Sequence, residues 1–263
     1  MSTVASALVA HGRSIPLGVL PLGTLNHFAK DLGLPLTLAE AAGVIGQANV
    51  SEVDVGMLND RVFINNSSLG VYPRLVLERD SHRGRFGLGK WPAMLLAILK
   101  TFRRFPMVSV RIETPDRVIR RKSPLVFVGN NEYQLDLLKV GARKCLNGGN
   151  LALYVTNAQS RWGMLCLSVR ALFGRLNQAR DFEAICLDEC WIETRRRRLH
   201  VALDGEVIKL HPPLHYRILP GALRVFLPPT AAAVPPVDRH QQSDQASLIG
   251  HERVARSPSV GGT

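Results

Sequence analysis

The chain has 263 residues, of which 46% are hydrophobic, and it carries a formal net charge of +12. Its longest apolar segment, residues 91–99, is far shorter than the ~20 residues that a membrane-spanning helix needs, and its start lacks the basic residues of a signal peptide. These features argue against a spanning or secreted protein and predict a cytoplasmic one. The excess positive charge favours anionic partners such as phospholipid headgroups, nucleotides or nucleic acid.

Helices and one short buried strand are predicted within the first fifty residues, which suggests half of an α/β unit with a parallel sheet. The first helix is expected at residues 2–10 and the strand at residues 15–20. Thr37 and Glu40 have the spacing of a capping box, in which both side chains bind free N–H groups of a helix. They predict a further helix that runs toward Gln47.

A turn is predicted around Gly23 and Thr24, between the strand and the capping box. Asn26 belongs to the residue types that cap helices, and a short helix is expected from His27 to Leu32. A strand, a glycine turn and a capped helix together direct free backbone N–H groups toward an anion. One Gly-Thr pair is a weak signal by itself, so an ordinary strand-to-helix turn is the alternative interpretation.

A β-rich region is predicted from residue 51 onward. Its first hairpin has strands at residues 53–57 and 61–65, joined by Asn59 and Asp60. A second hairpin is expected around Pro115 and Asp116. The strands expected from there on are residues 107–114, 117–128, 151–156, 181–194, 198–203, 207–210 and 216–227. Helices are expected at residues 73–80, 91–104 and 161–176.

These elements predict an α/β plus β fold in two domains and a tail. Residues 1–50 would form part of a Rossmann-like α/β nucleotide-binding domain, and residues 51–228 a β-sandwich-like domain. Residues 229–263 contain few apolar side chains and cannot bury enough surface to order themselves, so a disordered tail is predicted. The four cysteines form no CxxC pair, which favours reduced and mostly buried thiols over a metal site.

Three motifs resemble, in the same order, those of the diacylglycerol kinase catalytic-domain family, the lipid kinases that include sphingosine kinases and bacterial lipid kinases. The segment Pro21-Leu-Gly-Thr-Leu-Asn-His-Phe-Ala-Lys-Asp31 is similar to the family's Gly-Thr-x-Asn-Asp-Phe-Ala-Arg segment. Asn65-Asn-Ser-Ser-Leu-Gly70 resembles a strand that ends in a small-residue glycine turn. Leu203-Asp-Gly-Glu206 resembles the family's Asp-Gly-Glu motif. The resemblance that these motifs carry extends over most of residues 1–228.

The resemblance implies an ATP-dependent lipid kinase that phosphorylates the hydroxyl of a diacylglycerol- or sphingosine-like lipid. Glu206 would be the general base that takes the proton of this hydroxyl. Gly23, Thr24 and Asn26 would lie at the nucleotide phosphates, and Mg²⁺ would arrive with ATP. From the residues alone, a tight hairpin turn is predicted at Asp204 and Gly205. The side chain of Asp204 is expected to stabilise this turn.

The chain departs from the family's pattern in three places. The family's Gly-Gly-Asp-Gly-Thr loop precedes a helix like that at residues 2–10, so we expect an N-terminally shortened chain or a misplaced start codon. His27 stands where the family usually has Asp, and it is interpreted as a partly exposed first-turn residue. Asn147 and Gly148 replace acids of the family's structural magnesium site. Because a hard dication prefers carboxylate oxygens, that site is predicted to be weakened or lost, and no metal ligand is assigned.

Two other classes of function stay open. A catalytically inactive fragment or pseudokinase could bind lipid or anionic membrane surfaces through basic segments such as Arg195–Arg198, although a strand there would point alternate arginines to opposite faces. A nucleic-acid binder rests on charge alone, because no basic-aromatic interleaving is present, and no nucleic-acid partner is expected. The expected partners are the nucleotide and a lipid substrate at the membrane surface, with peripheral association, and a homodimer remains open.

Overall fold

The computed structural model describes residues 1–12, 15–23, 26–73, 107–132, 146–156, 160, 163 and 182–229. The chain divides into two units, Met1–Ala233 and Val234–Thr263, and every described residue lies in the first. The helices predicted at residues 91–104 and 161–176, most of the helix predicted at 73–80, and almost all of the predicted tail lie outside the described residues. The domain boundary placed at residue 50 stays a prediction.

Three helices precede the strands in the described part of the chain. They are α1 (Ser2–Ala10), α2 (His27–Asp31) and α3 (Leu38–Gly46). The strands are β1 (Val50–Leu58), β2 (Arg61–Phe63), β3 (Asn66–Gly70), β4 (Val108–Glu113), β5 (Val118–Ser123), β6 (Leu125–Asn130), β7 (Leu151–Thr156), β8 (Phe182–Leu187), β9 (Glu189–Thr194), β10 (Leu199–Leu203), β11 (Glu206–Leu210) and β12 (Leu214–Phe226). No helix among these residues is long and apolar enough to cross a membrane.

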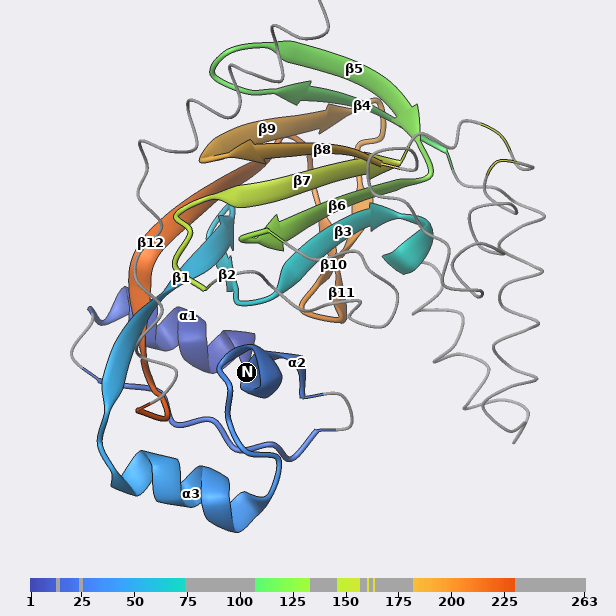
Figure 1. The fold of residues 1–263 in the computed structure, drawn as a ribbon. Helices are drawn as coiled ribbons and strands as arrows, with labels where there is room; N and C mark the ends of the chain where they lie inside the picture. Colours follow the sequence, from blue (N-terminus) through green and yellow to red (C-terminus); the bar gives the residue numbers. More distant parts are fainter. Residues whose placement is uncertain are drawn as a thin grey trace, which may run out of the picture. The chain divides into compact units, whose positions relative to one another are not determined.

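The strands form two six-stranded antiparallel sheets, which share one hydrophobic core. The first sheet has the order β2-β1-β12-β9-β4-β5 and the second β11-β10-β3-β6-β7-β8. Alternate residues of β4, among them Val110 and Ile112, are buried and pack in one cluster with Val128 and Leu153 of the second sheet. Each such side chain contributes about 1.5–3 kcal/mol when fully buried. The α/β plus β-sandwich-like fold predicted from the sequence is therefore confirmed (Figure 1).

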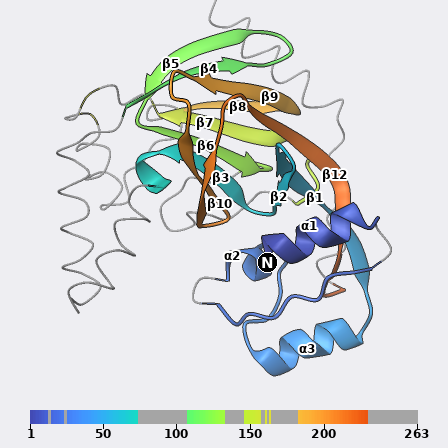
Figure 2. The same ribbon diagram turned by 180° about the vertical axis from the view of Figure 1, so that it is seen from behind.

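The helices belong to a second hydrophobic cluster at the far ends of β1 and β12. Phe28 of α2 and Val44 of α3 pack there with Val55 and Val225, and Figures 1 and 2 show the three helices gathered around this pair of strands. The predicted positions of all three helices are confirmed. α3 begins after Thr37, whose hydroxyl donates a hydrogen bond of 2.5 Å to Glu40 Oε2 and makes none to the helix backbone, so the capping contact predicted for Thr37 is wrong.

The strand predicted at residues 15–20 is wrong. This segment makes one isolated parallel bridge, between Leu17 and Val225, in which Leu17 N donates to Arg224 O at 2.8 Å. Pro16 and Pro21 bracket the bridge and have no N–H group to extend a ladder. Before β1 begins at Val50, the described part of the chain therefore contributes helices and this one bridge, and the sheets are built from Val50 onward.

Two strands predicted as continuous are each divided between the sheets. Residues 117–128 break at Pro124 into β5 of the first sheet and β6 of the second, and residues 181–194 break at Asp188 into β8 of the second and β9 of the first. Proline cannot donate to a ladder, and the carbonyl of Pro124 instead accepts a bond from Val71 N at 2.8 Å. Each break joins an edge strand of one sheet, β5 or β8, to an inner strand of the other, β6 or β9.

The two described cysteines have different surroundings. Cys190 of β9 is buried, and desolvation raises the pKa of its thiol to about 12, so that it remains protonated at neutral pH. Cys186 of β8 is exposed. Both are free thiols, and of the two only Cys190 has the buried position predicted for the cysteines.

Glycine is required at position 70, the last residue of β3, which lies beside the strand break at Pro124. Its φ is +100°, and a Cβ at this position would lie 2.1 Å from the carbonyl oxygen of Pro124. We expect Gly70→Ala to lower the free energy of unfolding by about 2–4 kcal/mol, because backbone must move to relieve the clash. Gly43→Ala is the control, since its Cβ would meet no atom within 4 Å and alanine favours a helix. Equal thermal midpoints for the two variants would contradict this account.

Candidate functional site

Two of the three sequence motifs meet through the carboxylate of Asp204. Its Oδ2 accepts a hydrogen bond from Ile64 N at 2.9 Å, and its Oδ1 accepts bonds from Asn65 N at 2.8 Å and Asn66 N at 3.1 Å. Asp204 N also donates to Asn66 O at 2.9 Å. Three successive N–H groups thus bind one carboxylate, an arrangement that favours its charged form. Asp204 was predicted to serve its own turn, and instead it ties that turn to the start of β3.

The turn at Asp204 and Gly205 has the geometry that the sequence predicted. Both residues have positive φ, +48° and +89°, and the two-residue loop pairs Leu203 with Glu206. Positive φ at both central residues is the requirement of the tight turn that suits a twisted hairpin. Glu206 follows as the first residue of β11 and is exposed. A carboxylate is therefore presented by a hairpin whose tip is fixed in place.

A buried hydroxyl pair supports β3 from the core side. Ser67 Oγ and the hydroxyl of Tyr216 lie 2.9 Å apart, and the Tyr216 ring packs edge-on against Phe63 with centroids 6.3 Å apart. Burial raises the pKa of Tyr216 well above its ordinary value, so its hydroxyl stays neutral. Small side chains in the Asn65–Gly70 motif leave room for this contact.

Glu206 lines a pocket of about 560 Å³. Hydroxyl side chains of α1, among them Ser2 and Ser6, lie on one side of it, and Asp60 and Arg61 of the β1–β2 turn lie on another. Apolar residues of β10 and β11 complete the lining. Arg61 was not singled out from the sequence, because a basic residue after a hairpin turn has no distinguishing pattern.

Gly23 and Asn26 form a closed turn before α2. Asn26 Oδ1 accepts a hydrogen bond from Gly23 N at 2.8 Å, and Asn26 Nδ2 donates to Pro21 O at 3.2 Å. Asn26 precedes α2 with φ of +49° and makes no side-chain hydrogen bond to it, so its predicted capping contact is wrong. Thr24 lies outside the described residues. Neither Gly23 nor Asn26 lines the pocket of Glu206. His27 begins α2 and is exposed, as predicted.

A second carboxylate, Asp54, is 3% exposed and interrupts β1 at a bulge. Its Oδ1 accepts a bond from Gly221 N at 2.8 Å, and its Oδ2 accepts bonds from Gly149 N at 2.7 Å and Asn131 Nδ2 at 3.2 Å. Asp54 N donates to Leu146 O at 2.9 Å. A buried carboxylate with three donors is well compensated, and it holds the loop of residues 146–150 against the first sheet.

The loop of residues 146–150 does not fit a structural Mg²⁺. Its side chains are amides and an aliphatic group, and the carboxylate in contact with it, Asp54, already receives three N–H donors. Across the part of the chain that the structure describes, no three His, Cys, Asp or Glu residues are grouped as metal ligands. Hard dications require several oxygen ligands, so no step is assigned to a metal at this loop.

The run Arg195–Arg198 is a loop and not the strand considered from the sequence. It lies between the end of β9 at Thr194 and the start of β10 at Leu199, and all four arginines are exposed. Alternate arginines would point to opposite faces only in a strand. In this loop, that alternation does not prevent the four arginines from contacting one anionic surface.

Residues 1–58 match the sequence model of the Diacylglycerol kinase catalytic domain. The chain is 27% identical over 241 residues to "Probable lipid kinase YegS" of Salmonella typhimurium strain LT2, a match covering 87% of this chain and 75% of that protein. The protein of that name from Salmonella newport is 27% identical over 237 residues, covering 86% and 74%. A crystal structure named as "a putative diacylglycerol kinase" from Bacillus anthracis superposes with a TM-score of 0.62 at 26% identity, covering 87% and 74%.

The sandwich and the helices packed on β1 and β12 form the fold that the chain shares with this structure. The match over residues 1–58, the curated relatives and this structure together support the diacylglycerol kinase catalytic-domain family for the chain. A second Bacillus anthracis diacylglycerol kinase structure, 21% identical with a TM-score of 0.55, shares the fold.

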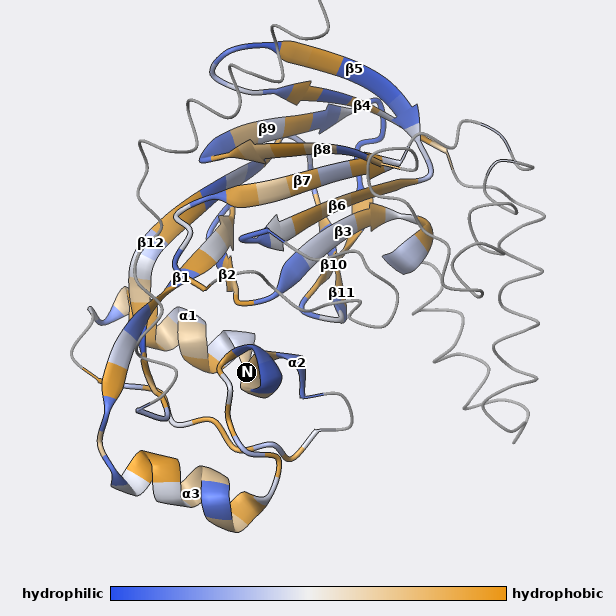
Figure 3. Ribbon diagram, in the orientation of Figure 1, coloured by the Kyte–Doolittle hydropathy of each residue, from blue (hydrophilic) through white to orange (hydrophobic). Residues whose placement is uncertain are grey.

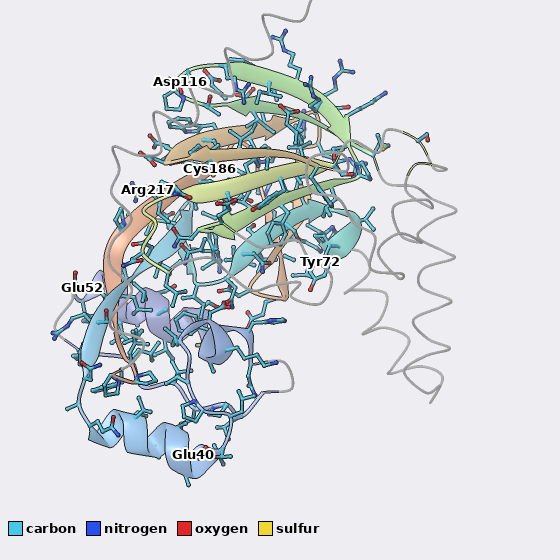
Figure 4. The ribbon with its side chains drawn as sticks, in the orientation of Figure 1. Glu40, Glu52, Tyr72, Asp116, Cys186 and Arg217 are labelled. Atoms are coloured by element: carbon cyan, nitrogen blue, oxygen red, sulfur yellow. The ribbon has the colours of Figure 1, made fainter. Side chains whose placement is uncertain are left out.

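Replacing the Asp204 carboxylate tests the clamp. Asp204→Asn places an NH₂ group against backbone N–H donors, and we expect it to lower the free energy of unfolding by about 2–4 kcal/mol. Asp116→Asn is the matched control in the exposed β4–β5 turn (Figure 4), where surface changes cost about 0.5 kcal/mol or less. Urea denaturation of both variants gives the comparison. Equal midpoints would show that the three hydrogen bonds contribute nothing to stability.

Proposed function

We propose that the chain is an ATP-dependent lipid kinase that phosphorylates the hydroxyl of a diacylglycerol- or sphingosine-like lipid, with Glu206 as the general base. The observation that carries the proposal is the exposed Glu206 carboxylate, which lines a pocket from a hairpin tip fixed by Asp204. The match of residues 1–58 to a kinase domain model and the relatives named as lipid kinases support the reaction class.

The proposed reaction needs one proton acceptor beside the hydroxyl. The Glu206 carboxylate takes the hydroxyl proton while the lipid oxygen forms a bond to the γ-phosphorus. The bond from that phosphorus to the β–γ bridging oxygen breaks, and ADP leaves with the electron pair. Arg61 contributes a cationic residue to the same pocket, where it would favour the negative charge of the phosphoryl group.

The nucleotide phosphates are proposed to lie at the turn before α2. Gly23 and Thr24 would face the phosphates, and Asn26 would act by holding the turn, since both polar atoms of its side chain bind Pro21 and Gly23. Mg²⁺ would enter as part of the ATP complex and not through a resident site. The acceptor lipid places the reaction at a membrane surface, with the protein bound peripherally.

A second function, lipid binding without catalysis, is favoured by the exposed Arg195–Arg198 loop. Anionic vesicles would bind such a protein, and ATP would not. Vesicle sedimentation and nucleotide titration of the wild-type chain therefore separate the two functions.

Glu206→Gln tests the assignment of the base. We expect turnover of diacylglycerol or sphingosine with labelled ATP to fall about 10²–10⁴-fold, because the amide cannot accept the proton. Nucleotide affinity should stay unchanged, since the phosphates are proposed to bind at the other turn. Glu40→Gln on α3 is the matched control (Figure 4) and should keep wild-type turnover.

Wild-type turnover in Glu206→Gln would remove Glu206 from the mechanism. Absence of wild-type turnover with both lipids would leave lipid binding as the better function.

A further inference from the structure

A second hollow, of about 530 Å³, lies on the first sheet between β4, β5 and the end of β9. Five cationic residues and one acidic residue line it: Arg111, Arg120, Arg121, Lys122, Arg195 and Glu193. We refer to this site as the basic groove. Figure 3 shows the second half of β5 as strongly hydrophilic.

Ion pairs account for two of the five cations. Arg111 Nη1 lies 2.8 Å from Glu113 Oε2 and 2.9 Å from Glu193 Oε2. Arg121 Nη2 lies 3.4 Å from Glu183 Oε2. Arg120, Lys122 and Arg195 have no carboxylate within 4.0 Å among the residues that the structure describes. The groove therefore keeps an excess of positive charge after its internal pairs are formed.

Strand register places this excess on one outward face. Arg120 lies opposite Arg111, and Lys122 lies opposite Ser109, so these side chains share a face of the sheet. Ile119, which directly precedes Arg120 and so points to the opposite face, is buried in the core. Like charges opposite each other cost stability, yet the strand carries three consecutive exposed cations.

The loop of residues 195–198 extends the same charge beyond the strand. Its four arginines are exposed, and Arg196 Nη2 donates a 3.4 Å hydrogen bond to Met107 O, immediately before β4. The loop is thereby held beside the strand that forms the floor of the groove.

Protection of a sheet edge explains part of this pattern. β5 is the last strand of its sheet, and cations on an edge strand oppose pairing with other chains. That role requires no cation in the loop after β9, which is an inner strand, and no hollow. Arg195 and the groove therefore call for an anionic ligand.

We propose that the basic groove binds the phosphate headgroups of an anionic bilayer and holds the protein on its surface. The choice of a bilayer rests on the proposed function, whose acceptor is a membrane lipid. Charge complementarity supplies the attraction, and Val118, 47% exposed on β5, adds an apolar contact beside the cations. Nucleic acid is a poorer fit, because single-strand binding uses free aromatic faces. The aromatic residue of β9, Trp191, is already stacked on His215, with ring centroids 4.6 Å apart.

The test compares the double variant Arg120→Glu/Lys122→Glu with Lys30→Glu/Lys209→Glu, which makes the same change of charge at exposed lysines outside the groove. The complete chain is sedimented with vesicles of phosphatidylcholine alone or mixed with phosphatidylglycerol, at about 0.15 M salt. We expect the groove variant to bind the mixed vesicles at least tenfold more weakly than wild type. The control variant should lose about threefold or less.

Three outcomes would overturn the proposal. The first is equal binding of wild type to neutral and anionic vesicles. The second is an equal loss of vesicle affinity in the two variants. The third is that wild type binds a labelled DNA duplex more tightly than the mixed vesicles and that the groove variant no longer binds this DNA. Thermal midpoints equal to that of wild type show that both variants are folded.

Turnover of lipid dispersed in neutral detergent separates this proposal from the catalytic one. The groove variant should turn over such lipid at the wild-type rate, because Arg120 and Lys122 do not line the pocket of Glu206. Anionic-vesicle binding that depends on the groove, in a chain with no turnover, would support the groove and reject the kinase mechanism. Turnover without vesicle binding that depends on the groove would support the kinase mechanism and reject the groove.

Discussion

The candidate site depends on the hydrogen bonds that three backbone N–H groups donate to one carboxylate. Asp204 binds the amides of Ile64, Asn65 and Asn66 across 138 to 140 residues of sequence. Hydrogen bonds to a charged acceptor contribute about 1.5–3 kcal/mol each, so together they can hold a hairpin tip that would otherwise fray. Since the next charged side chain is Glu206, the same contact fixes where that carboxylate is presented.

Asp54 plays a similar part in the middle of β1. It is buried and binds N–H groups from β12, from the 146–150 loop and from Asn131. Each of these two acids receives three N–H donors. Both therefore act as anchors, and the exposed Glu206 is the acid proposed for chemistry at the hairpin.

Positive charge is distributed unevenly over the first sheet. Arg111 and Arg121 are neutralised by neighbouring carboxylates, whereas Arg120, Lys122 and Arg195 are not paired among the described residues. Exposed ion pairs add at most about 1 kcal/mol, so the pairs do little for stability. Because the paired arginines also line the groove, the charge that can attract a polyanion there comes from Arg120, Lys122 and Arg195.

Local sequence determined the pieces whose energetics are local. The Asp204-Gly205 turn, the Asn59-Asp60 turn and the three helices follow from backbone preferences and from residues a few positions apart. Tertiary structure decided the rest: Pro124 and Asp188 divide strands because two sheets must share one core. Asp204 binds distant amides and not its own turn, because the partners of a carboxylate are set by which backbone groups the folded sheets bring within about 3 Å.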